Sequence, residues 1–364
     1  MKSQLRIGIL TGGGDCPGLN AVIRAVAKTA INDYDMEVIG FQDGFQGMVE
    51  NRTVELSYRT VSGILAQGGT ILGTSNRADP FHYPQWEDGK YAYHDRSDQA
   101  LANFQALGLE ALVCIGGDGT MTAAYGLAQK GLKVVGVPKT IDNDLWGTDQ
   151  TFGYDSALIT ATEAIDKIHT TAQSHHRVMV VEVMGRYAGW LALGAGLASG
   201  GDIILIPEIP YDIEAVCQRV KERNFRGNRF SIVVVGEGAK PEGGSMVVKR
   251  LVEGSPDAIR LGGIGHQIAA QIEEKTQVET RVTVLGHLLR GGVPSPFDRI
   301  LATRFGVEAV RAVLRKDFGK MVALKGQDII GVPLEEVAGK TRTVPLDSPL
   351  ILAARSVGTC LGDK

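Results

Sequence analysis

Short apolar runs rich in β-branched residues alternate with helix-length amphipathic segments along most of this chain of 364 residues. This alternation predicts an α/β fold whose sheet is mostly parallel and covered by helices on both faces, because parallel strands need crossover connections. Strands are expected at 5–10, 37–41, 111–115, 133–138, 177–183, 202–206, 230–235 and 281–285. Helices are expected at 18–31, 97–107, 120–130, 155–172, 187–198, 212–224 and 262–275.

The length suits two domains of ordinary size or one large α/β unit. A turn-like segment near 140–155, flanked by Gly147 and Gly153, marks the expected break. We therefore expect two Rossmann-like lobes at 1–148 and 149–296, with the active site in the cleft between them. The part from about 297 reads as helical and is expected to return to the first lobe. The polar, turn-rich stretch 76–98 reads as a long irregular loop, either functional or an ordinary surface insertion.

The composition limits the classes of partner and the cellular compartment that are expected. The formal charge is 38 − 41 = −3, so no global positive field recruits nucleic acid or a membrane. No apolar run approaches the roughly 20 residues that a membrane helix needs. The four cysteines, Cys16, Cys114, Cys217 and Cys360, are far apart, which favours reduced thiols over a disulfide or zinc framework. A cytoplasmic protein is expected.

Two short acidic segments, the first of them rich in glycine, follow neighbouring predicted strands. Gly116–Thr120 comes after the strand at 111–115, and Thr140–Asp144 comes after the strand at 133–138. In an open α/β sheet, ligands bind in the crevice at the carboxyl ends of the strands. The first segment offers bare backbone amides for phosphate, and the second offers carboxylates for a metal ion and a proton. Together they indicate phosphoryl transfer.

Each segment also has a plainer interpretation. In Gly116–Thr120, Asp118 is suited to reach Mg²⁺, although an Asp-Gly turn that caps the next helix would look similar. The Thr11–Asn20 turn, with Gly12, Gly13 and Gly14, fits an anion or a tight chain reversal. It lacks the spacing of the dinucleotide fingerprint, and the chain has no Walker A loop.

Asp142 and Asp144 are two residues apart, so in an extended segment they would point the same way. One carboxylate could then take a hydroxyl proton while the other neutralises or orients a cation, and a positioned base contributes about 10²–10⁴ in rate. A solvated acidic turn is the alternative. Arginine's planar fork suits phosphate oxygens; four arginines stand at predicted strand or loop junctions: Arg177, Arg186, Arg281 and Arg290.

Taken in order, these segments resemble the phosphofructokinase family over about residues 5–315. The matching strings are Gly13-Gly14-Asp15, Gly116-Gly117-Asp118-Gly119-Thr120, Thr140-Ile141-Asp142-Asn143-Asp144, Val181-Glu182-Val183-Met184-Gly185-Arg186, and Val284-Leu285-Gly286-His287 running into Arg290-Gly291-Gly292. The resemblance implies transfer of the γ-phosphoryl group of ATP to the 1-hydroxyl of fructose 6-phosphate with Mg²⁺.

The resemblance also implies roles for individual residues. Asp142 would be the catalytic base, Thr140 and Arg186 would assist it, and Asp118 would hold the metal. The nucleotide would lie against Gly14, Arg77, Ala78, Gly117, Asp118, Gly119 and Thr120. Fructose 6-phosphate would contact Thr140, Asp142, Met184, Gly185, Arg186, Glu237, His287 and Arg290. Arg177 and Arg281 would complete a neighbouring subunit's site, which implies a homo-oligomer, a dimer of dimers.

The phosphoryl donor depends on two positions. Pyrophosphate-using relatives carry a second aspartate after the metal aspartate, where this chain has Gly119, so ATP is favoured. Lys139, however, resembles the pyrophosphate type, and the combination is similar to the mixed-substrate branch. The main alternative is therefore a pyrophosphate–fructose 6-phosphate 1-phosphotransferase. Kinases of diacylglycerol or NAD share a GGDGT-type loop but lack the sugar-phosphate strings, and a non-catalytic subunit would not need Asp142.

Overall fold

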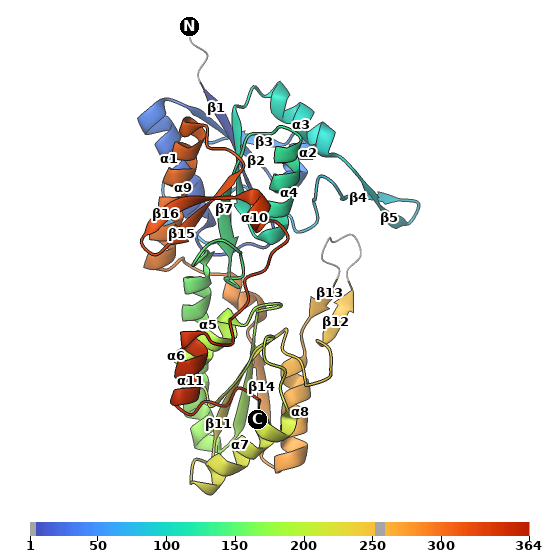
Figure 1. Cartoon of the computed structure of the whole chain (residues 1–364), viewed down its shortest axis with the longest axis vertical. Coiled ribbons are helices and arrows are strands. Elements are labelled where there is room, and N and C mark those ends of the chain that lie inside the picture. The colour runs from blue at the N-terminus through green and yellow to red at the C-terminus, as the bar shows by residue number, and fades with distance from the viewer. Residues whose placement is uncertain (1–4, 252–258, 364) are drawn as a thin grey trace.

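The computed structural model describes residues 5–251 and 259–363, whose helices and strands form two lobes stacked end to end (Figure 1). Every strand and helix expected above is present, with ends shifted by at most a few residues. The first sheet has the spatial order β16 (Asp328–Pro333), β15 (Lys320–Lys325), β7 (Val134–Thr140), β6 (Ala111–Gly116), β1 (Arg6–Thr11), β2 (Glu37–Phe41) and β3 (Thr53–Glu55), and β8 (Phe152–Gly153) pairs with the end of β7.

The strands from β15 to β2 are parallel, while β16 and β3 add antiparallel edges. The second sheet is parallel throughout, in the order β10 (Ile203–Leu205), β11 (Ser231–Gly236), β9 (Val178–Val183) and β14 (Thr280–Val284). Residues 231–235 are fully buried, as a continuous apolar run in a parallel sheet requires. The α/β class with mostly parallel sheets is confirmed.

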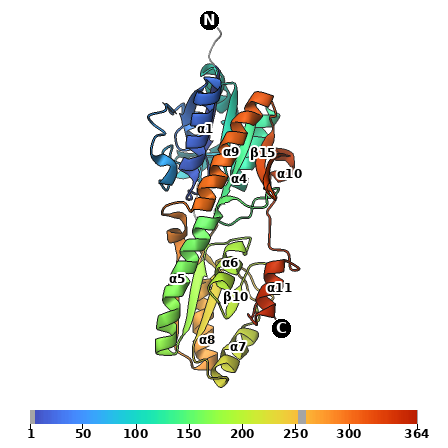
Figure 2. The same ribbon diagram turned by 90° about the vertical axis from the view of Figure 1, so that its left-hand side faces the viewer.

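Helices cover both faces of each sheet. On the first sheet, α1 (Leu19–Tyr34) and α9 (Pro296–Arg315) lie side by side on one face (Figure 2). The other face carries α2 (Phe45–Glu50), α3 (Ser97–Ala106), α4 (Asp118–Gln129) and α10 (Leu334–Val337). On the second sheet, the helices are α5 (Tyr154–His175) and α6 (Trp190–Ala198) on one face, α7 (Ile213–Phe225) and α8 (Ile264–Thr276) on the other, and α11 (Pro349–Ser356) against α6. One apolar core runs through α1, α9, α5 and α6, so it is continuous between the lobes.

The first turns of α5 and α9 cap one another where the lobes meet. The Asp298 carboxylate, in α9, accepts hydrogen bonds from the Ser156 amide at 2.8 Å and the Ser156 hydroxyl at 2.5 Å. In return, the Ser295 hydroxyl that precedes α9 donates to Asp155 of α5 at 2.6 Å. Carboxylates near helix N-termini satisfy otherwise unpaired amides and meet the favourable end of the helix dipole. The two helices are thereby fixed at a common point.

Two expectations about irregular or helical segments are wrong. The chain after about 297 is not helical throughout: between α9 and the later helices α10 and α11, 320–333 folds into the strand pair β15–β16, and β15 extends the first sheet beside β7. The stretch 76–98 contains the antiparallel hairpin β4 (Tyr83–Glu87) and β5 (Lys90–His94). A second hairpin, β12 (Val248–Leu251) and β13 (Ile259–Leu261), projects from the second lobe. None of the helices within 5–251 and 259–363 has the length and apolar character needed to cross a membrane.

Candidate active site

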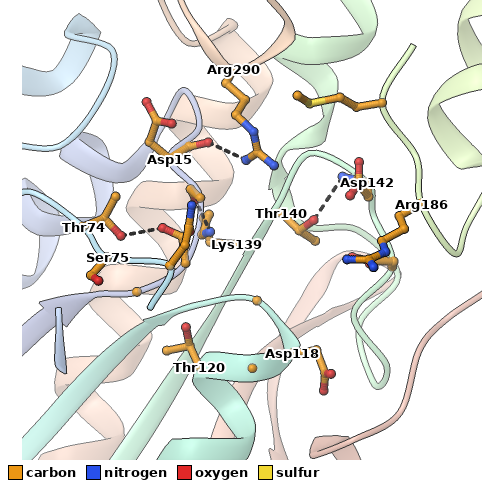
Figure 3. A pocket seen from close by; sticks show the side chains of 18 of the residues that line it. Asp15, Thr74, Ser75, Asp118, Thr120, Lys139, Thr140, Asp142, Arg186 and Arg290 are labelled. Atoms are coloured by element: carbon orange, nitrogen blue, oxygen red, sulfur yellow. Dashed lines mark hydrogen bonds between the residues drawn. The ribbon is translucent and has the colours of Figure 1, made fainter. Parts of the chain in front are cut away.

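A cleft of about 830 Å³ lies where the carboxyl ends of strands from both sheets face each other. The first lobe contributes the segments after β1, β6 and β7, and the second contributes the segments after β9, β11 and β14. The predicted residues that line the cleft are Gly14, Ala78, Gly117, Asp118, Gly119, Thr120, Lys139, Thr140, Asp142, Met184, Arg186, Glu237, His287 and Arg290. Figure 3 shows how several of them converge.

The start of α4 forms one wall. The helix begins at Asp118, earlier than expected, so Asp118, Gly119 and Thr120 form its first turn and Gly117 precedes it. A helix N-terminus presents unpaired amides and a partial positive charge, which suit a phosphate. A Cβ atom on Gly119 would meet no atom within 4 Å, so the cleft is open there.

Gly12 and Gly116 are needed for packing against Thr120 and not for binding a phosphate. A Cβ atom at Gly12 or Gly116 would lie 2.6 Å or 2.2 Å from the Thr120 hydroxyl oxygen, because that side chain sits between the turn after β1 and the end of β6. These glycines therefore allow Thr120 to join two strand ends. The amides that remain for an anion on this wall belong to Gly117 and the first turn of α4.

Asp118 is half-buried and already partly satisfied. Its Oδ1 accepts hydrogen bonds from the Gly339 amide at 3.0 Å and the Thr122 hydroxyl at 3.5 Å. Burial raises the pKa of this carboxyl, and the negative charge of Asp144 raises it further, against the two hydrogen bonds. Asp118 and Asp144 therefore act on each other across the cleft.

The Thr140–Asp144 segment is not extended, which corrects the sequence expectation. Asn143 has φ 51°, in the left-handed region, and reverses the chain between the two aspartates. The Asn143 side-chain oxygen accepts a hydrogen bond from the Thr151 amide at 3.0 Å, which holds this conformation. Asn tolerates left-handed backbone better than most residues. Asp142 and Asp144 thus line the cleft together through a turn.

Asp142 has the chemistry of a base. Its amide donates to the Thr140 hydroxyl at 3.0 Å, which fixes the start of the turn (Figure 3). Its Oδ1 is covered by protein, yet it has no hydrogen-bond partner among the described residues. Burial raises the pKa of this carboxyl to about 7, with a further contribution from the charge of Asp144. A carboxylate with a pKa near neutrality is suited to accept a proton.

Lys139 lies behind this turn with 4% of its surface exposed. Its ammonium group donates to the Gly14 carbonyl oxygen and so ties β7 to the glycine turn after β1 (Figure 3). Burial lowers the pKa of Lys139. The lysine is close enough to the two aspartates to lower both of their pKa values.

The second lobe supplies the basic wall. Arg290, at the end of a 3₁₀ turn at Gly286–Arg290, donates to the Asp15 carbonyl oxygen at 3.0 Å and thereby reaches the first lobe. Arg186 is drawn next to Asp142 in Figure 3, and its guanidinium lies 4.8 Å from the centroid of the Tyr187 ring. His287 is exposed at the rim. Two arginines therefore face the carboxylates.

Four predicted residues are not among those that line the cleft. Arg77 extends toward the β4–β5 hairpin, where it donates to the Tyr91 hydroxyl at 3.4 Å. Gly185 lies just behind Met184, with φ 133°. Arg177 and Arg281 share one partner, Glu279, to which Arg177 is paired at 2.8 Å. Both arginines stand at the β9–β14 edge of the second sheet.

The sequence reasoning missed several cleft residues, of which Thr74, Ser75, Asn76 and Asp79 form the largest group. The Thr74 hydroxyl donates to the Gly13 carbonyl oxygen at 2.6 Å, so this segment crosses over the glycine turn. The polar run that begins at 74 was the available signal, because it adjoins the irregular stretch. Lys249, from the β12–β13 hairpin, gave no signal at all.

The site suits a cation that is bound partly by protein carboxylates and partly by substrate phosphates. No group of three or more metal-binding side chains occurs within the described residues. Mg²⁺ commonly takes only one or two carboxylates and completes its shell with water and substrate phosphates. Asp118 and Asp144 are two interacting carboxylates of that kind, and the cleft has room for phosphates beside them.

Comparison with known proteins agrees with this geometry. Residues 6–313 match the family model "Phosphofructokinase". The chain is 52% identical to the ATP-dependent 6-phosphofructokinase 2 of Clostridium perfringens, covering 100% of both chains. It is 53% identical to the pyrophosphate–fructose 6-phosphate 1-phosphotransferase of Streptomyces coelicolor, covering 93% of this chain and 96% of that protein.

Among solved structures, Pichia pastoris phosphofructokinase in the T-state superposes with a TM-score of 0.80 at 33% identity. The match covers 93% of this chain but only 36% of the yeast chain, so this chain spans about a third of that protein. The chain belongs to the phosphofructokinase family.

Proposed function

We propose that this protein is an ATP-dependent 6-phosphofructokinase. It transfers the γ-phosphoryl group of MgATP to the 1-hydroxyl of fructose 6-phosphate and yields fructose 1,6-bisphosphate and ADP. The observation that carries the proposal is the position of Asp142. This carboxyl, with a pKa raised to about 7 and an unpartnered Oδ1, lies in a cleft between the α4 N-terminus and two arginines of the second lobe.

The first lobe holds the nucleotide. Amides at Gly117 and the first turn of α4 bind phosphate oxygens, and Gly14 and Ala78 border the same part of the cleft. Open space at Gly119 leaves room for the α-phosphate of a nucleotide. This space favours ATP over pyrophosphate as donor, even though a relative with the pyrophosphate activity is as similar as those named for ATP.

Lys139 is the residue that favours pyrophosphate as the phosphoryl donor, because it resembles the pyrophosphate type. In this structure its ammonium group is bound to the Gly14 carbonyl, so part of its charge is engaged within the protein. A pyrophosphate-dependent enzyme is therefore the second candidate, and the donor assay below separates the two.

Asp118 holds Mg²⁺ together with substrate phosphates, and Asp144 contributes the second negative charge. When bound, the metal neutralises charge on the phosphates and orients them. Thr140 donates a hydrogen bond that stabilises the Asp144 carboxylate and lowers its pKa, against the burial that raises it. The two aspartates therefore differ: the pKa of both is raised by burial, but Asp144 has the Thr140 hydrogen bond to oppose the shift, whereas Oδ1 of Asp142 has no partner among the described residues.

Asp142 accepts the proton of the sugar 1-hydroxyl as the hydroxyl oxygen attacks the γ-phosphorus of ATP, and ADP leaves. Arg186 and Arg290 offer cationic groups to the phosphate oxygens, on which charge is spread in the transition state. Glu237, His287 and Met184 complete the sugar side of the cleft. The reaction needs little covalent participation by the protein, so positioning and charge supply most of the rate.

Arg177 and Arg281 are proposed to complete the site of a second subunit. They stand at the open edge of the second sheet, where β14 has a neighbour on one side only. The adjoining apolar side chains Val284, Leu288 and Val293 are 46%, 67% and 63% exposed, an arrangement that suits burial against another copy. A homotetramer built as a dimer of dimers is the proposed assembly. The four free cysteines support a reducing, cytoplasmic compartment.

A coupled assay tests the function. Purified protein with fructose 6-phosphate and Mg²⁺ is given ATP, ADP or pyrophosphate in turn, and formation of fructose 1,6-bisphosphate is followed. We expect turnover with ATP to exceed turnover with pyrophosphate by at least tenfold. The reverse order would replace the proposal by the pyrophosphate enzyme, and no product with any donor would refute both.

A further inference from the structure

The segment 338–344, which follows α10, crosses from the first lobe to the second and continues into α11 (Figure 1). On the way it touches both carboxylate segments of the cleft. The Gly339 amide donates to Asp118 at 3.0 Å, and Thr341 forms a β-bridge with Leu145. Neither contact follows from the cleft strings in the sequence, because each comes from a residue about 200 positions later.

Arg342 binds the turn that carries the proposed base through two hydrogen bonds. Its backbone amide donates to the Asp144 carbonyl oxygen at 2.7 Å. Its guanidinium Nη1 donates to the Asn143 carbonyl oxygen at 3.1 Å. Two successive carbonyls of the turn are therefore bound by one residue, and one of them belongs to the left-handed Asn143. A backbone in this region persists when surrounding contacts hold it.

The same residue is fixed to the second lobe. The Arg342 carbonyl oxygen accepts a hydrogen bond from the Trp190 indole at 2.9 Å, and the guanidinium lies 4.2 Å from the centroid of the Trp190 rings. Trp190 is 8% exposed and begins α6. Stacking on an indole face is favourable for a guanidinium and holds it in one orientation.

Glu208 secures the crossing two residues further on. Its carboxylate accepts hydrogen bonds from the Val344 amide at 2.8 Å and from the Gly189 amide at 2.9 Å, beside Trp190. The segment is thus anchored on the second lobe at two adjacent points. Arg342 is the only described residue that binds both the Asn143 carbonyl and the Trp190 indole through hydrogen bonds.

We infer that Arg342 is a positioning residue for phosphoryl transfer, which links the Asp142–Asp144 turn to α6 of the sugar-phosphate lobe. It is not among the residues that line the cleft, and it acts by holding the turn from which Asp142 reaches the sugar hydroxyl. The inference rests on the proposed role of Asp142 as base. A displacement of about 1 Å in such a group can cost about 10²-fold in rate.

The test compares Arg342→Ala with the parent enzyme and with Arg355→Ala. Arg355 lies in α11 on the same C-terminal segment, where it pairs with Asp363 and makes no contact with the turn. For each protein, kcat, KM for ATP, KM for fructose 6-phosphate and the thermal unfolding midpoint are measured. For Arg342→Ala we expect kcat to fall by about 10- to 100-fold while both KM values stay within about threefold. Arg355→Ala should keep the parent's kcat.

Arg342→Lys adds a rescue test, because lysine keeps the charge and an aliphatic stem over Trp190 but loses the planar fork. We expect its kcat to lie between those of the parent and Arg342→Ala. Should Arg342→Ala fail to fold, Trp190→Phe decides, since it keeps the aromatic packing and removes only the indole donor. We then expect kcat to fall severalfold at unchanged KM.

Two results would overturn the inference: a kcat within twofold of the parent's in the decisive variant, or KM values that rise as much as kcat falls. A parent enzyme without kinase activity would instead refute the proposed function. The two failures are therefore distinct.

Discussion

Replacing Gly119 by aspartate should impair the use of ATP while leaving the fold intact. Gly119 lies in the first turn of α4, and a Cβ atom there would meet no atom within 4 Å. The new side chain therefore fits without displacing protein. It extends into the cleft beside Asp118, where the nucleotide phosphates are proposed to bind.

The size of the effect follows from Coulomb's law. A carboxylate about 5 Å from a phosphate charge costs roughly 3 kcal/mol at an effective dielectric constant of about 20. Gly119 is exposed, so solvent and Mg²⁺ screen part of this repulsion. A net cost of about 1.5–3 kcal/mol corresponds to a fall of about 10- to 150-fold in kcat/KM for ATP.

The assay measures kcat/KM for ATP and for pyrophosphate in the parent, Gly119→Asp, Gly119→Asn and Gly119→Ala. Asparagine has the size of aspartate without its charge, and alanine adds only the Cβ atom. We expect a graded loss with ATP, largest for aspartate and smallest for alanine, and a smaller loss with pyrophosphate, which has no α-phosphate to accommodate. If kcat/KM for ATP in Gly119→Asp stays within threefold of the parent's, the nucleotide does not lie against this turn.

Three further predictions concern the base and the sugar phosphate. Asp142→Ser should lower kcat by about 10²–10⁴ with little change in fructose 6-phosphate affinity by calorimetry; equal loss of both would indicate a structural role. The pKa of Asp142 is raised to about 7, so the carboxylate becomes protonated and can no longer act as a base as the pH falls below this value. We therefore expect kcat/KM of the parent to decline below about pH 7, and the residual activity of Asp142→Ser to show no such decline. A decline that persists in Asp142→Ser would assign it to another group. Arg281→Ala should raise KM for fructose 6-phosphate about tenfold or more at nearly constant kcat. The half-exposed Arg281 side chain lies outside the cleft of its own subunit, and it is proposed to bind the sugar phosphate in the site of a second subunit. An unchanged KM would show that Arg281 does not belong to the sugar-phosphate site.

The central parallel strands were predictable because they are short apolar runs rich in β-branched residues. Residues 111–115 and 231–235 are buried along their whole length, so their sequences carry one meaning. The strand β15 was not predictable in this way. Its residues 320–325 include Met, Ala, Leu and Lys, which favour helix, and pairing with β16 along its length and with β7 at its start makes them a strand.

The candidate site likewise contains residues that the local sequence predicts and a conformation that it does not. Asp118, Asp142 and Arg290 stand in distinctive strings directly after strands, so the sequence placed them at one edge of the sheets. The conformation of Asn143 could not be read locally, because Arg342 and Thr151 hold it from other parts of the chain. Contacts between segments remote in sequence leave no periodic pattern, and they are the part of the site that coordinates alone supply.

The packing of α9 against α1 has a consequence for biogenesis. The first lobe is assembled from both ends of the polypeptide, since α9, β15 and β16 join a sheet whose other strands belong to the first 153 residues. During synthesis, the apolar face of α1 and the β7 edge stay uncovered until all four strands of the second sheet have left the ribosome. A nascent chain that ends before α9 therefore carries an unfinished surface, and completion of the first lobe depends on the synthesis of α9, β15 and β16.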